Sequence, residues 1–283
     1  MRRARSPHCP SPIEGLYPDT VADGALRSRP GAELRLGRRR WLVAVSVGMP
    51  MVAVVVLAVE AGLARQGEML TGAPLELDTS VGEGPEPSLV VVWLGDSTAA
   101  GVGASRSAAA LPIQVARGLD RPVDVSVLAR SGATVADVVD CQLPAIAELS
   151  PDVVFVSVGA NDVTHLTSRA DFERAYRRLV AGLPESAEVV LLGVPDMGAI
   201  PRLAQPLRAV AGFRGRQLDD VVGEVAADTG SAYVDIDGEA GPPFRRDPGR
   251  FFAADRYHPS DAGYDLWAEA VLDVLRQPVM LAG

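Results

Sequence analysis

Five short apolar runs recur along the second two-thirds of the chain, and they predict buried strands. They span residues 89–94, 123–128, 153–158, 188–194 and 232–236. Short apolar runs bounded by turn residues are typical of strands that are covered on both faces. Between the runs, apolar residues recur at helical spacing, as in Phe172, Tyr176, Leu179 and Leu183. This alternation predicts an α/β fold: a flavodoxin-like three-layer α/β/α sandwich around a five-stranded parallel sheet.

A longer apolar run near the N-terminus predicts a transmembrane helix before this domain. The run from Trp41 to Val59 contains no charged residue, and a helix of this length spans roughly 28 Å, close to the hydrocarbon thickness of a bilayer. Arg35, Arg38, Arg39 and Arg40 precede it, so the positive-inside rule leaves the N-terminus in the cytoplasm. We therefore expect a single-pass cell-membrane protein whose main domain is extracytoplasmic. A cleaved signal peptide, and hence a secreted protein, is the alternative.

These features divide the chain into four segments. Residues 1–40 are rich in proline and arginine without any period, so we expect a disordered basic segment. Residues 41–64 are the anchor or signal sequence. Residues 65–88 contain repeated glycine and proline and predict a linker. Residues 89–283 are numerous enough for one well-buried domain.

The charge of the chain is unevenly distributed. The 283 residues are 48% hydrophobic and 22% charged, which is typical of a folded protein, and the net charge is −9. Residues 1–40 carry nine arginines and four acids, a net +5, which leaves −14 for the remainder. An acidic main domain argues against nucleic-acid binding. The chain has no lysine, which excludes mechanisms that need a P-loop or Schiff-base lysine.

Polar loops follow the predicted strands at four places. The first three are Gly95-Asp96-Ser97, Ser131-Gly132-Ala133 and the stretch from Gly159 to Asp162, and the fourth runs from Asp255 to His258, beyond the fifth strand. The carboxyl ends of parallel strands meet at one edge of the sheet, where open α/β sheets bind their ligands. We therefore expect the four loops to meet in one site.

Together these loops contain the parts of a serine hydrolase. Ser97 needs a base to become a nucleophile, and His258 can take its proton at neutral pH. Asp255 can orient the imidazole and stabilise its protonated form. The backbone N–H groups of Ser97 and Gly132 and the side-chain amide of Asn161 can donate to the oxyanion of a tetrahedral intermediate. No metal ligand is expected in this site.

Each loop alone has a simpler interpretation. Gly-Asp-Ser is common in turns, a lone Asn161 is usually a satisfied turn residue, and Asp-x-x-His often precedes a helix cap. Gly95-x-Ser97-x-Ala99 also nearly matches the nucleophile elbow of α/β-hydrolases, but that elbow follows several strands and Ser97 follows one. His165 is expected to be a solvated loop residue. Four such pieces in this order, each after a strand, favour a catalytic site.

The four loops resemble the sequence blocks of the SGNH hydrolases, also called GDSL-type esterases and lipases. Gly95-Asp96-Ser97 matches the nucleophile block, with Thr98 where leucine is common, and Gly132 matches the glycine block. Gly159-Ala160-Asn161-Asp162 and Asp255-x-x-His258 match the other two. The resemblance covers residues 89–276. It implies the flavodoxin-like SGNH fold and hydrolysis of esters or thioesters without a metal or organic cofactor.

We therefore expect a serine esterase that forms an acyl-serine intermediate and acts on a small acyl ester or a lipid. Residues 195–206 and 237–254 are expected to wall the pocket, with Met197, Ile200, Pro201, Phe244, Phe251 and Phe252 as candidates to hold a short or medium acyl chain. Acyl transfer to, or deacetylation of, envelope glycans or lipids is an alternative. A catalytically inactive, membrane-tethered binding domain is another.

Overall fold

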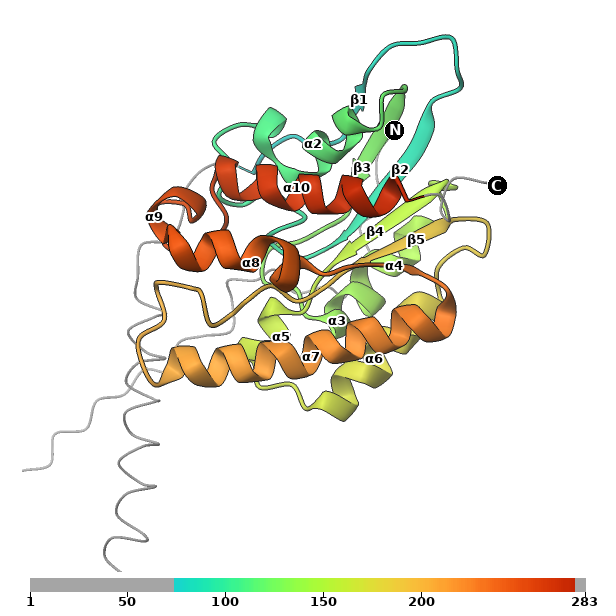
Figure 1. Cartoon of the computed structure of the whole chain (residues 1–283). Helices are drawn as coiled ribbons and strands as arrows, with labels where there is room; N and C mark the ends of the chain where they lie inside the picture. Colours follow the sequence, from blue (N-terminus) through green and yellow to red (C-terminus); the bar gives the residue numbers. More distant parts are fainter. Residues whose placement is uncertain (1–73, 278–283) are drawn as a thin grey trace, which may run out of the picture.

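The computed structural model describes residues 74–277. These residues form a sheet with helices on both faces (Figure 1). The expected disordered segment and the expected transmembrane helix at residues 41–59 lie outside the described residues, as does the first part of the expected linker. Within residues 74–277, no helix is both long enough and apolar enough to cross a membrane.

The sheet has six strands, in the order β1-β3-β2-β4-β5-β6. Their bounds are β1 Thr79–Val81, β2 Leu89–Gly95, β3 Val123–Val127, β4 Val153–Ser157, β5 Glu188–Leu192 and β6 Ala232–Val234. Strands β2 to β6 are parallel and correspond to the five predicted apolar runs. The α/β sandwich with these strands at its centre is confirmed.

The expectation of a purely parallel, five-stranded sheet is wrong, because β1 adds an antiparallel edge strand. Thr79 pairs with Val125 of β3, and the hydroxyl of Ser80 donates to Oδ1 of Asp124 over 2.6 Å. This strand lies inside the segment expected to be a linker. Three residues are too few to display an alternating pattern, so the surrounding glycines and prolines dominate the sequence signal.

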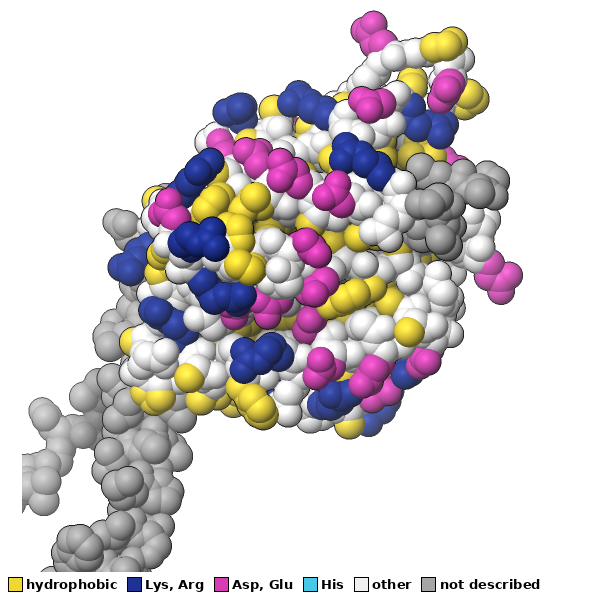
Figure 2. Space-filling model, viewed as in Figure 1, with side chains coloured by type: hydrophobic (Ala, Val, Ile, Leu, Met, Phe, Trp, Pro, Cys, Tyr) yellow, Lys and Arg dark blue, Asp and Glu magenta, His cyan; other side chains and the backbone are white. Residues whose placement is uncertain are grey.

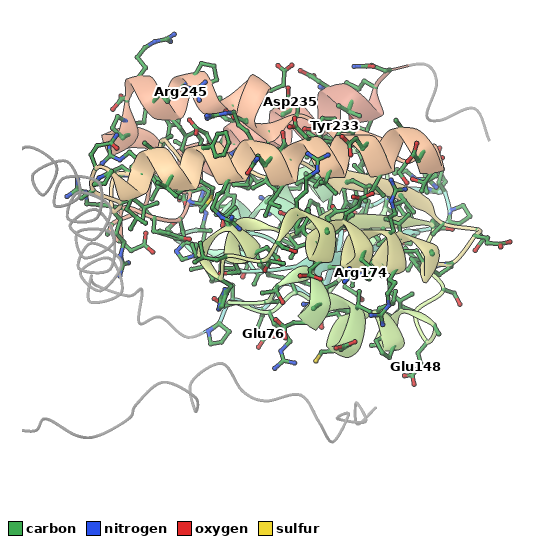
Figure 3. All side chains as sticks on the ribbon, turned by 90° about the horizontal axis from the view of Figure 1, so that it is seen from below. Glu76, Glu148, Arg174, Tyr233, Asp235 and Arg245 are labelled. Carbon is green, nitrogen blue, oxygen red and sulfur yellow. The ribbon has the colours of Figure 1, made fainter. Side chains whose placement is uncertain are left out.

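Two layers of helices cover the sheet (Figures 1 and 3). Helices α2, α8, α9 and α10 lie on one face, and α3 to α7 lie on the other. The bounds are η1 Ser107–Ala109, α2 Leu111–Gly118, α3 Val135–Asp137, η2 Val138–Gln142, α4 Leu143–Ile146, α5 Ala160–Thr164, α6 Arg169–Ala181, α7 Leu207–Thr229, α8 Ile236–Arg246, α9 Pro248–Phe251 and α10 Asp261–Leu275. Thr134 caps the start of α3: its hydroxyl accepts the N–H of Asp137, whose carboxylate accepts the N–H of Thr134.

The core is densest around β2. Val92, Trp93 and Leu94 are fully buried, and the ring of Trp93 stacks on that of Phe155 in β4 at a centroid distance of 4.4 Å. Burying such side chains contributes about 1.5–3 kcal/mol each. The strand that leads to the Ser97 turn is therefore rigidly supported from both faces.

Candidate active site

Ser97 stands on a tight turn directly after β2. Gly95 has φ +144°, and a Cβ at this position would lie 1.9 Å from the carbonyl oxygen of Ser157 in the neighbouring strand. Only glycine allows this approach. The backbone N–H of Asp96 donates to the same carbonyl over 3.0 Å. The turn is thus tied to β4, and Ser97 is held at the carboxyl edge of the sheet.

Gln142 clamps the same turn from the opposite side. Its amide oxygen accepts the N–H of Gly95 and its amide nitrogen donates to the carbonyl of Gly95, both over 2.8 Å. The side chain is 1% exposed, so both hydrogen bonds are shielded from water. Sequence reasoning missed this residue because it lies in η2, 47 positions away from Gly95, and no recognised motif surrounds it.

His258 comes from the loop between α9 and α10. The loop closes on itself, because the N–H of Ala253 donates to the carbonyl of His258 over 2.8 Å and Phe252 forms an isolated antiparallel bridge with Pro259. Ser260 then caps α10 by accepting the N–H of Gly263. The imidazole is therefore presented from a short, internally bonded turn.

The structure brings Ser97, His258 and Asp255 into one hydrogen-bonded chain. The Oγ of Ser97 lies 3.0 Å from Nε2 of His258, and Nδ1 of His258 lies 2.6 Å from Oδ2 of Asp255. When Nδ1 donates to the carboxylate, Nε2 is free to accept the serine proton. This is the arrangement that activates a serine hydroxyl as a nucleophile.

The environment of Asp255 keeps it ionised. Its other oxygen, Oδ1, accepts the backbone N–H groups of Tyr257 and His258 at 3.0 and 3.1 Å. Burial acts to raise the pKa of Asp255, but hydrogen bonds from the His258 side chain and these N–H groups outweigh it and hold the pKa below its ordinary value. An ionised carboxylate at this place stabilises the imidazolium that forms when Ser97 loses its proton.

The three predicted oxyanion donors lie on three loops of the same edge. Gly132 follows β3 with φ +83°, and Asn161 lies in the first turn of α5, which follows β4. One N–H of the Asn161 amide donates to the carbonyl of Ala133 over 3.0 Å, which orients the amide and leaves its second N–H available. Among the described residues, no hydrogen-bond partner is found for the backbone N–H of Ser97 or of Gly132.

Asp162 fastens these loops together. Its carboxylate accepts the N–H of Val135 over 3.0 Å, which links the start of α5 to the start of α3. Asp162 is 1% exposed, and this burial raises its pKa. His165, which directly follows α5, is exposed, as expected for a solvated loop residue, and its Nδ1 lies 2.7 Å from the carbonyl oxygen of Asn161.

Asp96 and Thr98 form a buried polar pair beneath Ser97. The N–H and the hydroxyl of Thr98 both reach Oδ1 of Asp96, at 3.0 and 2.9 Å, and the hydroxyl also lies 2.9 Å from Oγ of Ser157. Burial raises the pKa of Asp96 to about 6. Threonine at position 98 therefore contributes hydrogen bonds that a leucine could not make.

A mainly apolar cavity that is partly open to solvent adjoins Ser97 and His258. Of the predicted wall residues, Met197, Ile200, Phe244 and Phe252 line it, whereas Pro201 and Phe251 do not. Ile236 and Trp267 line it as well, and both had the appearance of ordinary core residues in the sequence. The apolar lining of this cavity suits a small or chain-like apolar ligand.

The cavity wall is braced by an ion-pair cluster. Arg245 on α8 pairs with Asp196, and its Nη1 lies 3.1 Å from Oδ1 of Asp237; Figure 3 shows Arg245 near the C-terminal end of α8. Asp196 lines the cavity, so this cluster connects the loop after β5 to α8. Within residues 74–277, no group of three or more His, Cys, Asp or Glu side chains is arranged to hold a metal ion.

Comparison with known proteins places these features in a family. Residues 93–266 match the sequence model of the GDSL-like lipase/acylhydrolase family. A GDSL-like esterase of Mycobacterium tuberculosis is 34% identical over 190 residues, which cover 64% of this chain and 60% of that protein. The match thus spans less than two-thirds of the relative's length.

Solved structures share the fold. A lipase/acylhydrolase from Enterococcus faecalis has a TM-score of 0.54 at 22% identity, covering 66% of this chain and 95% of its own. A phospholipase A1 from Streptomyces albidoflavus has a TM-score of 0.53 at 24% identity, covering 67% and 98%. At these identities the likeness concerns the fold alone.

Proposed function

Because the chain belongs to the GDSL-like lipase/acylhydrolase family, we propose that it is a serine esterase that hydrolyses short to medium acyl esters or thioesters through an acyl-serine intermediate. The observation that carries the proposal is the hydrogen-bonded chain from Ser97 through His258 to Asp255. It opens onto a cavity with a mainly apolar lining, which suits the tail of an acyl group.

In the acylation step, Oγ of Ser97 attacks the ester carbonyl while Nε2 of His258 takes the hydroxyl proton. The carbonyl π-electrons move to the oxygen, and this oxyanion receives hydrogen bonds from the N–H groups of Ser97 and Gly132 and from the amide of Asn161. When the tetrahedral intermediate collapses, the C–O bond to the leaving alcohol breaks and His258 returns the proton to that alcohol.

Deacylation repeats the sequence with water. His258 removes a proton from the water, and the hydroxide attacks the acyl carbonyl. When this second tetrahedral intermediate collapses, the bond between the acyl carbon and Oγ of Ser97 breaks, and His258 returns the proton to Oγ, which releases the acid and regenerates Ser97. No step needs a redox or metal partner. Capture of the same acyl-enzyme by an alcohol would make the protein an acyltransferase, so the experiment includes alcohol acceptors.

The substrate class follows from the cavity. Its walls of Met197, Ile200, Phe244 and Phe252 suit the apolar tail of an acyl group, and burial of each methylene contributes about 0.8 kcal/mol. We further propose that residues 41–59 hold the chain in the membrane with the esterase domain outside the cytoplasm. The surplus of acids beyond residue 40 supports a small ester or lipid as partner and not a nucleic acid.

The test is hydrolysis of p-nitrophenyl esters, from acetyl to palmitoyl, by the full chain beside its Ser97→Ala variant. We expect turnover that depends on Ser97, with an optimum at short or medium chains. Turnover that Ser97→Ala leaves unchanged would refute the proposal. If product appears only when an alcohol is added, as a new ester, the protein is a transferase instead.

A further inference from the structure

Three large apolar side chains are exposed among the described residues, and all three gather beside the candidate active site. Leu166 is 68% exposed, Phe213 57% and Val210 38%. Leu166 lies in the loop after α5, and the other two lie in the first two turns of α7. The side chain of Arg214 joins the two elements by donating to the carbonyl of Thr167 over 2.7 Å. We call Leu166, Val210 and Phe213, with Arg208, Arg214 and Arg216, the rim patch.

The rim patch borders the cavity that holds Ser97. Ala160 and Asn161 of α5 line the cavity, as do Met197 and Ile200 in the loop before α7. The opposite side of α7 packs on that loop, because a Cβ at Gly215 would lie 3.1 Å from Cγ of Met197. Residues 210 and 213 therefore point outward from the same segment whose inner side supports the cavity wall.

The charges of α7 are separated along its length. The first half of the helix, residues 207–218, contains Arg208, Arg214 and Arg216 and no acid, and residues 219–229 contain four acids and no base. Figure 2 shows dark blue and yellow side chains near the start of α7, with magenta side chains further along. This order opposes the helix dipole, which favours acids at the N-terminus and bases at the C-terminus. The order of bases and acids along α7 therefore does not serve the stability of the helix.

The positive charges of the three arginines in the rim patch are not neutralised by acidic side chains of the described residues. Within the described residues none of the three pairs with a carboxylate: Arg208 donates to the carbonyls of Pro201 and Leu203, and Arg214 to that of Thr167. On the neighbouring helix, by contrast, Arg169 and Arg177 pair with acids of the second half of α7, Glu224 and Asp228. A helical segment with exposed Phe and Val beside unpaired arginines has the composition of an interfacial lipid-binding surface.

We propose that the rim patch docks the domain on an anionic lipid bilayer, so that the cavity beside Ser97 faces the lipid from which its substrate enters. Leu166, Val210 and Phe213 enter the headgroup region, and Arg208, Arg214 and Arg216 attract anionic headgroups. This proposal extends the proposed esterase function by saying where the substrate comes from. Of the two experiments below, only the one that measures hydrolysis rests on that function.

The first experiment measures docking without turnover. The full chain is reconstituted in phosphatidylcholine vesicles with brominated acyl chains, with or without about one third phosphatidylglycerol. Bromine quenches the fluorescence of a tryptophan that enters the bilayer. After the wild-type fluorescence is subtracted, the fluorescence of F213W is expected to fall about twofold in the anionic vesicles and less in the neutral ones. The control is E148W, exposed at the opposite edge (Figure 3). Equal quenching of both variants, or none for F213W, would overturn the proposal.

The second experiment tests the charges by reversing one of them. Arg216 and Arg117 are both exposed, and neither forms an ion pair within residues 74–277. Arg216→Glu is expected to slow hydrolysis of an ester carried in anionic vesicles about tenfold and to leave a soluble ester unaffected, whereas Arg117→Glu changes neither rate. Equal rates for the two variants on vesicles would contradict docking. If the wild type hydrolyses neither ester, the proposed function fails and the quenching result alone decides the docking.

Discussion

At the scale of single residues, the side-chain amide of Asn161 has two N–H groups with different roles. One orients the side chain, and the other is proposed to bind the oxyanion. One N–H of its amide donates to the carbonyl of Ala133, and the second is available to an oxyanion. In the proposed mechanism the second bond strengthens as negative charge develops on the substrate, so it stabilises the transition state more than the bound substrate.

Asn161→Ala is therefore expected to lower kcat about 10²–10³-fold with little change in KM. The measurement is steady-state hydrolysis of the best p-nitrophenyl ester. Thr164→Ala is the control, because the Thr164 hydroxyl donates to the backbone carbonyl of Asn161 and does not reach its amide. An effect confined to KM would mean that Asn161 binds the substrate and does not stabilise the oxyanion.

Asp96 is buried beneath the nucleophile, and burial raises its pKa from 3.8 to about 6. The folded protein therefore binds the Asp96 proton more tightly than the unfolded chain does. The stability that this gives is complete below about pH 4 and is lost as the pH rises through about 6. Between these two pH limits, the contribution of Asp96 to the free energy of unfolding changes by on the order of 3 kcal/mol.

Asp96→Asn removes this titration and keeps an acceptor for Thr98. We expect the free energy of unfolding to fall less between pH 4 and 7 in this variant than in the wild type, by about 1–3 kcal/mol. Urea unfolding at the two pH values measures the difference, with Asp140→Asn on the surface as control. An unchanged pH dependence would show that Asp96 does not titrate in this range.

At the scale of elements, Gln142 shows how a short helical segment can fix a loop from a distance. Its side chain satisfies both backbone groups of Gly95 inside the core. Gln142→Ala leaves the N–H of Gly95 buried and unpaired, whereas the carbonyl of Gly95 still accepts the N–H of Arg130 over 3.1 Å. We expect a loss of about 1–3 kcal/mol in the free energy of unfolding, together with a lower kcat because the Ser97 turn loosens.

Urea denaturation of the Gln142→Ala variant checks this prediction. The matched control is Gln114→Ala, since Gln114 makes one half-buried bond, to the carbonyl of Ala109, and its loss is expected to cost about 1 kcal/mol or less. Equal losses for the two variants would contradict the structural role of Gln142.

The elements also show what the sequence can and cannot reveal. The five parallel strands were predictable because strands covered on both faces read as continuous apolar runs. The edge strand β1 was not, because three exposed or half-buried residues beside glycines carry no pattern. Ser97, Gly132, Asn161, Asp255 and His258 were predicted from their loops, and the structure brings them to one edge. Ile236 and Trp267 were missed because apolar cavity walls and apolar cores use the same residues.

At the scale of the whole molecule, the proposed membrane association rests on where the chain carries its charged and apolar residues. The predicted span at residues 41–59 lies before the domain, and the rim patch lies at the edge of the sheet that carries the candidate active site. Elsewhere the domain is acidic, since residues beyond 40 carry a net charge of −14. Such a body is repelled by an anionic surface, so we expect the patch and the anchor together to fix its orientation.

The anchor predicts that the full chain remains with the membrane fraction after a carbonate wash and keeps its N-terminus. In cells whose outer envelope is permeabilised but whose cytoplasmic membrane is intact, added protease should degrade the domain. Recovery of a soluble chain that begins near Arg65 would show that a signal peptide had been cleaved instead.

Covalent trapping of Ser97 tests whether this serine is the nucleophile. The full chain is treated with a fluorophosphonate, which reacts with activated serines, and the adduct is located by mass spectrometry of its peptides. We predict one adduct, on Ser97, that is absent from Ser97→Ala and forms far more slowly in His258→Ala. An adduct on another serine, with Ser97 unmodified while ester hydrolysis stops, would contradict the account.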